Sequence, residues 1–328
     1  MTDVHDGAVL VTGGAGYVAP PLVRRLAESG RAVVVLDDFS TGRREHARWG
    51  TLVEGDAGDA ELVAETIRTH GVEAVMHFAA KALVGESMQD PALYDRWNRG
   101  KTEVFARTAA REGVKAFVFS STCAVYGDPV TVPIPEDHAL KPVNPYGRSK
   151  VACENALFGT GVPTAALRYF NAAGAEPAYD LGERHDPETH LIPLAIHAVQ
   201  RDEPITIFGT DYPTPDGTCV RDYIHVVDLA AVHLAALERL ETTGRGGVWN
   251  LGTGHGLSVR EILDAVGRVA GRPVPSVEGA RREGDPPALV AHAERARRDL
   301  GFVPRASDID RIVGDAWAFA EHVRRTRA

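Results

Sequence analysis

Short apolar runs alternate with longer amphipathic stretches through the first half of the chain. The runs are rich in β-branched residues and occupy positions 8–11, 32–36, 74–78, 116–119 and 164–168. Uniformly apolar strands are buried on both faces, and intervening segments of helix length allow neighbouring strands to run parallel. The pattern therefore predicts an α/β fold, with helices on both faces of a doubly wound parallel sheet.

Turn-forming residues become more frequent in the second half. Residues 172–188 are rich in glycine, proline and charge. Further on, Ser258 and Glu261 have the spacing of a capping box, which opens an amphipathic helix. We expect two regions, 1–170 and a smaller, loop-rich 171–328, with part of the second returning to the first.

The charge balance and the cysteines narrow the class of protein. Of the 328 residues, 36 are Lys or Arg and 45 are Asp or Glu, which gives a formal net charge of −9. A nucleic-acid-binding protein would carry a basic face, so we expect no nucleic-acid partner. No apolar run approaches the roughly 18 residues of a membrane span, so we expect no membrane partner. Cys123, Cys153 and Cys219 are widely separated, which is typical of a protein of the reducing cytoplasm.

A glycine-rich turn follows the first predicted strand and opens a helix. Gly13 and Gly16 leave the backbone amides unshielded, so that these amides and the helix dipole can bind a pyrophosphate. Asp37 ends the second strand, where its carboxylate can accept the ribose hydroxyls of an adenine nucleotide and repel a 2′-phosphate. The segment predicts a dinucleotide site that favours NAD over NADP. Ala19 replaces the usual third glycine, and Pro20 follows it in the first helical turn, where proline is tolerated.

A YxxxK motif provides candidate catalytic residues. Tyr146 and Lys150 are four residues apart and share one face of a helix. An ammonium beside the phenol favours the phenolate, which can take a proton from a substrate hydroxyl near neutral pH. Thr122 follows the fourth strand and can hydrogen-bond the same oxygen. The sequence therefore predicts Tyr146, Lys150 and Thr122 as the catalytic residues.

Long stretches of the chain resemble one family of enzymes. The matching segments include VTGGAGYV, FSSTCAVYGD, PYGRSK, HDPETHLIP and IFGTDYPTPDGTCVRDYIHVVDLA. The sequence is similar, nearly from end to end, to the extended short-chain dehydrogenase/reductase family and, within it, to the UDP-glucose (UDP-galactose) 4-epimerases. The resemblance implies an NAD-binding Rossmann domain over 1–170 and a mainly UDP-sugar-binding region over 171–328, in a cytoplasmic homodimer.

The resemblance also implies a reaction. Tyr146 takes the proton of the 4-hydroxyl while hydride passes from sugar C4 to bound NAD. The 4-keto intermediate rotates, and hydride returns to its opposite face. NAD is therefore regenerated in every turnover.

Binding residues are implied position by position. For NAD, the matching residues are Gly13, Gly16, Tyr17, Val18, Asp37, Asp38, Asp56, Ala57, Phe78, Ala79, Asn98, Ser120, Tyr146, Lys150 and Tyr169. For the UDP-sugar, they are Thr122, Asn171, His190, Leu191, Thr206, Phe208, Arg221, Tyr223, Arg282, Asp285 and Leu289. Among these, Arg221 and Arg282 match diphosphate-binding arginines, and Leu289 matches the residue beside the C2 substituent of the sugar.

Two positions depart from the pattern of the family. Ala82 stands where the family often has lysine, and Lys81 is displaced by one position, so we leave Lys81 out of the predicted site. His190 replaces a common asparagine. His185 and His190 are five residues apart, which is wrong for a pair of zinc ligands on one helical face, so we expect no metal site.

Other functions of this fold differ in how well the residues suit them. A sugar-nucleotide 4,6-dehydratase requires an acid and a base directly after the threonine, and Cys123 and Ala124 cannot transfer these protons. An alcohol dehydrogenase would release NADH, which the UDP-site matches do not support. A nucleotide sensor without activity would not need the intact catalytic residues. A 4-epimerase of UDP-N-acetylhexosamines, UDP-pentoses or UDP-hexuronates stays open, because only the sugar end of the site would differ.

Overall fold

The computed structural model describes residues 7–282 and 284–327 and contains two compact units. Unit 1 comprises Met1–Gly127, Leu140–Arg168 and Ala230–Trp249, and unit 2 comprises Asp128–Ala139, Tyr169–Leu229 and Asn250–Ala328. Both units therefore draw on several stretches of the chain. The division into 1–170 and 171–328 stays a prediction about which regions fold as domains.

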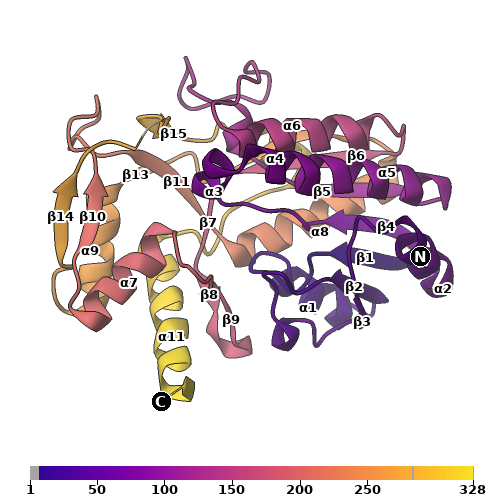
Figure 1. Cartoon of the computed structure of the whole chain (residues 1–328), viewed down its shortest axis with the longest axis horizontal. Coiled ribbons are helices and arrows are strands. Elements are labelled where there is room, and N and C mark those ends of the chain that lie inside the picture. The colour runs from indigo at the N-terminus through magenta and orange to yellow at the C-terminus, as the bar shows by residue number, and fades with distance from the viewer. Residues whose placement is uncertain (1–6, 283, 328) are drawn as a thin grey trace. The chain divides into compact units, whose positions relative to one another are not determined.

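A seven-stranded sheet forms the centre of unit 1 (Figure 1). Its order is β12-β6-β5-β4-β1-β2-β3. The strands are β1 (Ala8–Thr12), β2 (Val33–Asp37), β3 (Thr51–Glu54), β4 (Val72–His77), β5 (Ala116–Thr122), β6 (Thr164–Tyr169) and β12 (Gly247–Leu251). Strand β1 pairs in parallel with both β2 and β4, so the strand order reverses there. Open α/β sheets bind ligands at the carboxyl ends of the strands beside such a reversal. The predicted fold class is confirmed.

Strand β3 of this sheet is not predicted by the apolar pattern. It lies at the sheet edge, where Val34 to Asp37 of β2 pair with Thr51 to Glu54. Three of its four side chains are exposed, so the sequence Thr-Leu-Val-Glu lacks a buried apolar run. Edge strands of this kind leave only a weak hydrophobic signal.

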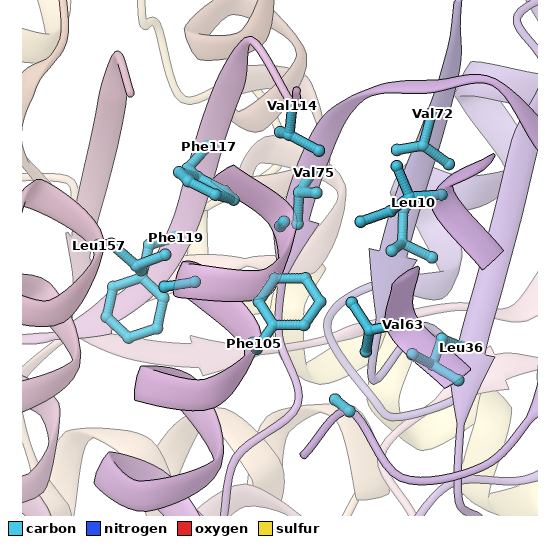
Figure 2. Close-up of a cluster of buried hydrophobic side chains, with 14 of the residues drawn as sticks. Leu10, Leu36, Val63, Val72, Val75, Phe105, Val114, Phe117, Phe119 and Leu157 are labelled. Carbon is cyan, nitrogen blue, oxygen red and sulfur yellow. The ribbon is translucent and has the colours of Figure 1, made fainter. Parts of the chain in front are cut away.

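Helices flank the sheet of unit 1. They are α1 (Pro20–Glu28), α2 (Ala60–His70), α3 (Val84–Gln89), α4 (Pro91–Tyr94), α5 (Lys101–Arg111), α6 (Pro145–Phe158) and α8 (Val226–Thr243), the last of which begins in unit 2. A π-helical turn, Asp95–Gly100, joins α4 to α5, and 3₁₀ turns lie at Arg44–His46 and Cys123–Val125. Val63 of α2, Phe105 of α5 and Leu157 of α6 pack onto Leu10 and Phe117 of the strands (Figure 2).

The opposite face of the same strands is equally buried. Val9, Val11, Val35 and Val118 alternate with the residues of the first cluster along β1, β2 and β5, and each is fully shielded from solvent. Alternate strand residues point to opposite faces. The sheet is therefore buried on both sides, as its continuous apolar runs predicted.

Unit 2 has smaller sheets and a helical core. Its strands are β7 (Asn171–Ala173), β8 (Ala175–Glu176), β9 (Leu181–Gly182), β10 (Ile205–Phe208), β11 (Val220–His225), β13 (Gly256–Ser258), β14 (Ser276–Gly279) and β15 (Ala288–Leu289). Its helices are α7 (Leu191–Arg201), α9 (Val259–Ala270), α10 (Glu294–Leu300) and α11 (Ile309–Arg327), with a 3₁₀ turn at Pro177–Tyr179. Helices α7, α9 and α11 contact one another around Ile196, Ile262 and Ile312.

Two properties of the helices were expected from the sequence: the capping box that begins α9, and the lack of a membrane-spanning segment. The capping box at the start of α9 forms as predicted, because Ser258 and Glu261 bond each other's backbone amides. Among the described residues, none of the helices combines the length and the apolar content that crossing a bilayer requires.

Candidate active site

The glycine-rich turn follows β1 directly and begins with a left-handed residue. Gly13 has a φ of 67°, and a Cβ atom there would lie 2.6 Å from the backbone nitrogen of Ala79. Only glycine fits both the dihedral angle and this close approach. Helix α1 begins after Ala19, and Pro20 and Pro21 occupy its first turn, where amides have no partner within the helix. The first helical turn accommodates both prolines.

Asp37 lies beside this turn at the end of β2. Its Oδ2 accepts a hydrogen bond from the Ala15 amide and its Oδ1 one from the Phe39 amide, each at 2.9 Å. Burial raises the pKa of Asp37, and the two amide donors oppose that shift. Each carboxylate oxygen keeps a second lone pair for a further donor. The neighbouring Asp38 has a different partner: its Oδ1 accepts a hydrogen bond from the Ser40 amide at 2.9 Å.

The turn and the carboxylate together fit a dinucleotide. Bare backbone at residues 13–16 can approach a pyrophosphate, and Asp37 can accept the two hydroxyls of a ribose. Asp56 lies past the end of β3, where its Oδ1 accepts the Gly58 amide at 2.7 Å and its Oδ2 pairs with Lys101 at 2.8 Å. These residues suit the adenosine half of NAD.

Asn98 connects the segment after β4 to helix α6. Its Oδ1 accepts the Lys81 amide at 2.8 Å, and its Nδ2 donates to the Lys81 carbonyl at 3.0 Å and to Ser149 Oγ at 2.9 Å. Asn98 is fully buried. Phe78, which begins the same segment, stacks on His233 with the ring centroids 4.9 Å apart. The residues assigned to the cofactor after β4 are therefore held from two sides.

Helix α6 carries both members of the YxxxK motif. Asn144 caps the helix, and its side chain accepts the Gly147 amide at 2.8 Å. A Cβ atom at Gly147 would collide with the carbonyl oxygen of Ala124, so this glycine lets the helix approach the end of β5. Lys150 Nζ lies 6.0 Å from the centroid of the Tyr146 ring. The helix therefore places the phenol and the ammonium together, as the spacing predicted.

The surroundings of Lys150 bring its pKa closer to neutrality. Its side chain is buried, and Nζ donates to the carbonyl oxygen of Ser120 at 2.8 Å. Burial lowers the pKa of Lys150 to about 8, although Glu154 acts in the opposite direction. Thr122, two residues beyond Ser120, accepts the Ala124 amide through Oγ1 at 3.2 Å. The Lys150 ammonium of α6 is thus held near the carboxyl end of β5, which also carries Thr122.

A buried ion pair behind these residues was not found from the sequence. Arg168 donates to Glu154 through Nε at 2.9 Å and through Nη2 at 2.6 Å. Ser121 Oγ donates to Glu154 Oε1 at 2.5 Å, and Arg168 Nη1 donates to the Tyr126 hydroxyl at 3.1 Å. Glu154 lies one turn after Lys150 on α6. The network therefore fixes that helix to β5 and β6.

In unit 2, three strands gather residues assigned to the UDP-sugar. Arg221 of β11 forms an ion pair with Asp285 and lies opposite Leu289 of β15. Tyr223, two residues further along β11, pairs with Asn171 of β7. These five residues come from three segments between positions 171 and 289, and the strand pairing brings them together.

The remaining nucleotide-sugar residues lie on β10 and before α7. The Arg282 guanidinium stacks over the Phe208 ring, 4.1 Å from its centroid, and Thr206 lies two residues earlier on the same strand. His190 precedes Leu191 at the start of α7, and its Nδ1 lies 2.6 Å from Glu183 Oε1. Burial would lower the pKa of His190, but Glu183 and Glu188 together outweigh it and raise the pKa to about 10.

Comparison with known proteins identifies the family. The model of the NAD dependent epimerase/dehydratase family matches residues 9–252. A UDP-glucose 4-epimerase of Rhizobium meliloti (strain 1021) is 47% identical over 329 residues, which cover 99% of each chain. The chain belongs to the NAD dependent epimerase/dehydratase family. The resemblance of the sequence to the UDP-glucose 4-epimerases of the extended short-chain dehydrogenase/reductases is confirmed.

Solved structures of family members have the same fold. The UDP-glucose 4-epimerase of Brucella ovis, in complex with NAD, superposes with a TM-score of 0.91 at 47% identity and covers 95% of this chain and 97% of its own. The enzyme of Bifidobacterium longum, in complex with NAD⁺ and UDP, superposes with a TM-score of 0.90 at 34% identity and covers 96% and 98%.

Proposed function

We propose that the chain is an NAD-dependent UDP-glucose 4-epimerase, which interconverts UDP-glucose and UDP-galactose. The observation that carries this proposal is the placement of Tyr146 one helical turn from the buried ammonium of Lys150, which donates to the Ser120 carbonyl oxygen near the carboxyl end of β5. A relative named UDP-glucose 4-epimerase, 47% identical over 99% of the chain, supports it. The activity is an isomerisation, so it consumes no oxidant.

NAD is the cofactor that the residues of unit 1 fit. The turn at Gly13 to Gly16 would hold the pyrophosphate, and Asp37 would bind the ribose of adenosine while repelling a 2′-phosphate. When bound, NAD supplies a nicotinamide ring that accepts hydride from the sugar and returns it. The buried Lys150 would face the nicotinamide end, as the resemblance implies.

Tyr146, assisted by Lys150 and Thr122, carries out the proton transfers. Tyr146 acts as the base that takes the proton of the 4-hydroxyl and later gives it back. The Lys150 ammonium stabilises the phenolate of Tyr146 through its positive charge. Thr122 hydrogen-bonds the same sugar oxygen and holds it within reach of Tyr146.

The nucleotide is held tightly and the hexose loosely. Arg221 and Arg282 provide planar donors for the diphosphate, and Phe208 provides a ring face for uracil. Asp285 already orients Arg221 through their ion pair. Leu289 is aliphatic and forms no hydrogen bond with a sugar hydroxyl, so the keto intermediate is free to turn at that side.

A second substrate class follows from Leu289. Tyrosine often occupies the matching position in epimerases that are strict for glucose and galactose. Leucine is shorter than tyrosine and leaves room for a C2 N-acetyl group, although an unpaired amide there costs about 1–3 kcal/mol. Activity on UDP-N-acetylglucosamine that is weaker than on UDP-glucose is therefore the second candidate function, alongside UDP-pentoses and UDP-hexuronates.

We also propose a cytoplasmic homodimer that serves galactose metabolism. The helical segment after Asp90 and the helix from Tyr146 would pack against their copies as a four-helix bundle, and Phe158 of α6 is an exposed apolar side chain. Cys123, Cys153 and Cys219 form no disulfide with one another, which suits a reducing compartment. Light scattering at micromolar concentration should give twice the mass of 35.2 kDa. A monomer would contradict the dimer.

The catalytic assignment is tested with Tyr146→Phe and a matched control, Tyr179→Phe. Loss of a general base reduces turnover of UDP-galactose by about 10²–10⁴-fold, whereas UDP affinity measured by calorimetry should stay within a few-fold. Tyr179 lies in unit 2 on an exposed turn, so its variant should behave as wild type. Unchanged turnover in Tyr146→Phe would remove Tyr146 from the chemistry. Wild-type protein incubated with each UDP-sugar decides the substrate range.

A further inference from the structure

Four side chains capable of binding a metal ion converge in unit 2, in the segment between β9 and α7. Glu183, His185, Glu188 and His190 each offer one donor atom, and these four atoms all lie within 4.8 Å of one another. The donors come from eight consecutive residues. Two imidazole nitrogens and two carboxylate oxygens form a ligand set that binds zinc and similar divalent ions.

The distances among the donors resemble those of a tetrahedral site. His185 Nδ1 lies 3.2 Å from Glu183 Oε1 and 3.8 Å from Glu188 Oε1. His190 Nδ1 lies 2.6 Å from Glu183 Oε1 and 3.5 Å from Glu188 Oε1. Zinc holds nitrogen and oxygen at roughly 2.0–2.2 Å, so the edges of its ligand tetrahedron are about 3.3 Å. Three of the four distances need to change by about half an ångström or less.

The carboxylates are buried and already oriented. The side chains of Glu183 and Glu188 are each 7% exposed, and burial of two negative charges requires compensation. Glu188 Oε1 accepts the amides of Thr189 at 2.8 Å and His190 at 3.0 Å, which holds the carboxylate in place. The His190 side chain is 43% exposed, so an ion can reach the cluster from solvent.

The five-residue spacing of His185 and His190 does not exclude a metal site in this segment. A separation of five residues is wrong for two ligands on one face of a helix, but His185 lies in an irregular loop and His190 precedes α7. Glu183 and Glu188 were also absent from that argument. In a loop, the chain path brings the two imidazoles together, with their ring centroids 5.2 Å apart.

We propose that Glu183, His185, Glu188 and His190 bind one Zn²⁺ ion in a structural, four-coordinate site. A sphere filled by four protein ligands leaves no position for a substrate, so the ion stabilises the segment 183–190 and the start of α7. The site goes beyond the proposed epimerase reaction, in which no metal takes part. Without the zinc ion, the alternative arrangement is two ion pairs, each between a protonated histidine and a carboxylate.

The test measures metal content and affinity, which are independent of epimerase turnover. Tag-free protein is dialysed against a chelator, reloaded with ZnCl₂ and analysed by mass spectrometry for zinc per chain, and a chromophoric competitor gives the affinity. We expect about one zinc per chain in wild type and in the control His255→Gln, whose histidine is exposed and lies outside the cluster. His185→Gln should bind at least about 100-fold more weakly, since even outer-sphere changes cost 10–100-fold.

Cobalt provides the geometric readout. Co²⁺ in the wild-type site should give the intense visible absorption of a tetrahedral complex, and His185→Gln should abolish it. Glu188→Gln is the second variant and should show the same loss if His185→Gln fails to fold. Wild-type protein that binds no zinc at micromolar concentration overturns the proposal. Zinc affinity that is equal in wild type and either folded variant, or a weak six-coordinate cobalt spectrum, also overturns it.

Discussion

Replacement of Lys150, the proposed catalytic lysine, by methionine should make the protein more stable while it abolishes activity. Lys150 is 2% exposed, and burial lowers its pKa from 10.5 to about 8. One pKa unit corresponds to about 1.4 kcal/mol, so the charged form of Lys150 destabilises the folded state by about 3 kcal/mol at neutral pH. Methionine has a similar shape and carries no charge.

The net gain is smaller than this cost because one hydrogen bond disappears. Lys150 Nζ donates to the Ser120 carbonyl oxygen at 2.8 Å, and a hydrogen bond contributes about 0.5–1.5 kcal/mol. Lys150→Met should therefore raise the free energy of unfolding by about 2 kcal/mol at pH 7. Turnover of UDP-galactose should fall by orders of magnitude, since the Tyr146 phenolate loses its cation. Such opposition between stability and activity is common at active sites.

The pH dependence separates this cause from other effects of the substitution. Because the pKa of Lys150 is lower in the folded than in the unfolded state, its penalty is complete below about pH 8 and disappears as the pH approaches 10.5. The advantage of the variant should therefore shrink by about 2 kcal/mol between pH 8 and pH 9.5.

Urea unfolding of wild type, Lys150→Met and Lys115→Met at several pH values provides the assay. Cofactor content is measured first, because a ligand that binds only the folded state adds its own stabilisation. Lys115 is exposed and pairs with Glu73, so its variant should change stability by about 0.5 kcal/mol or less at every pH. If Lys150→Met is less stable than wild type at pH 7, or if the difference does not depend on pH, the electrostatic account of Lys150 is wrong.

Two further predictions concern the network behind the site and the sugar pocket. Glu154→Gln leaves the buried Arg168 without its counter-charge and should cost about 3–5 kcal/mol in urea unfolding, whereas Glu294→Gln, which breaks an exposed pair with Arg297, should cost about 0.5 kcal/mol or less. Equal losses in the free energy of unfolding would show that the buried pair contributes no more to stability than the exposed pair. Leu289→Tyr should abolish activity on UDP-N-acetylglucosamine while turnover of UDP-galactose persists, measured by chromatography of the products. Retained N-acetyl activity in that variant would exclude position 289 as the gate.

Local patterns in the sequence predicted the parts of the site that depend on neighbouring residues. Tyr146 and Lys150 are related by one helical turn, and Gly13 is defined by the turn that joins a strand to a helix. Most strands of the central sheet could be predicted because they are buried on both faces. Strand β3 could not be predicted, since its exposed position at the edge removes the selection for apolar residues.

Contacts between distant segments could not be predicted in the same way. Glu154 and Arg168 lie on a helix and a strand, and a charged pair leaves no pattern until the fold shields it. Strand pairing likewise decides that Arg221 meets Leu289. The prediction of no metal site at residues 183–190 assumed the spacing of a helix. The loop that forms there instead places Glu183 and Glu188 close to the two histidines.

The central claim is that the hydrogen at C4 of the hexose leaves and returns to the same sugar within one turnover. Protein as purified, without added cofactor, is incubated with a mixture of UDP-galactose deuterated at C4 and ¹³C-labelled UDP-galactose with ordinary hydrogen. Mass spectrometry of the UDP-glucose formed should find deuterium only in the product without ¹³C. Deuterium in the ¹³C product, its loss to water, or the absence of UDP-glucose would contradict the proposed reaction.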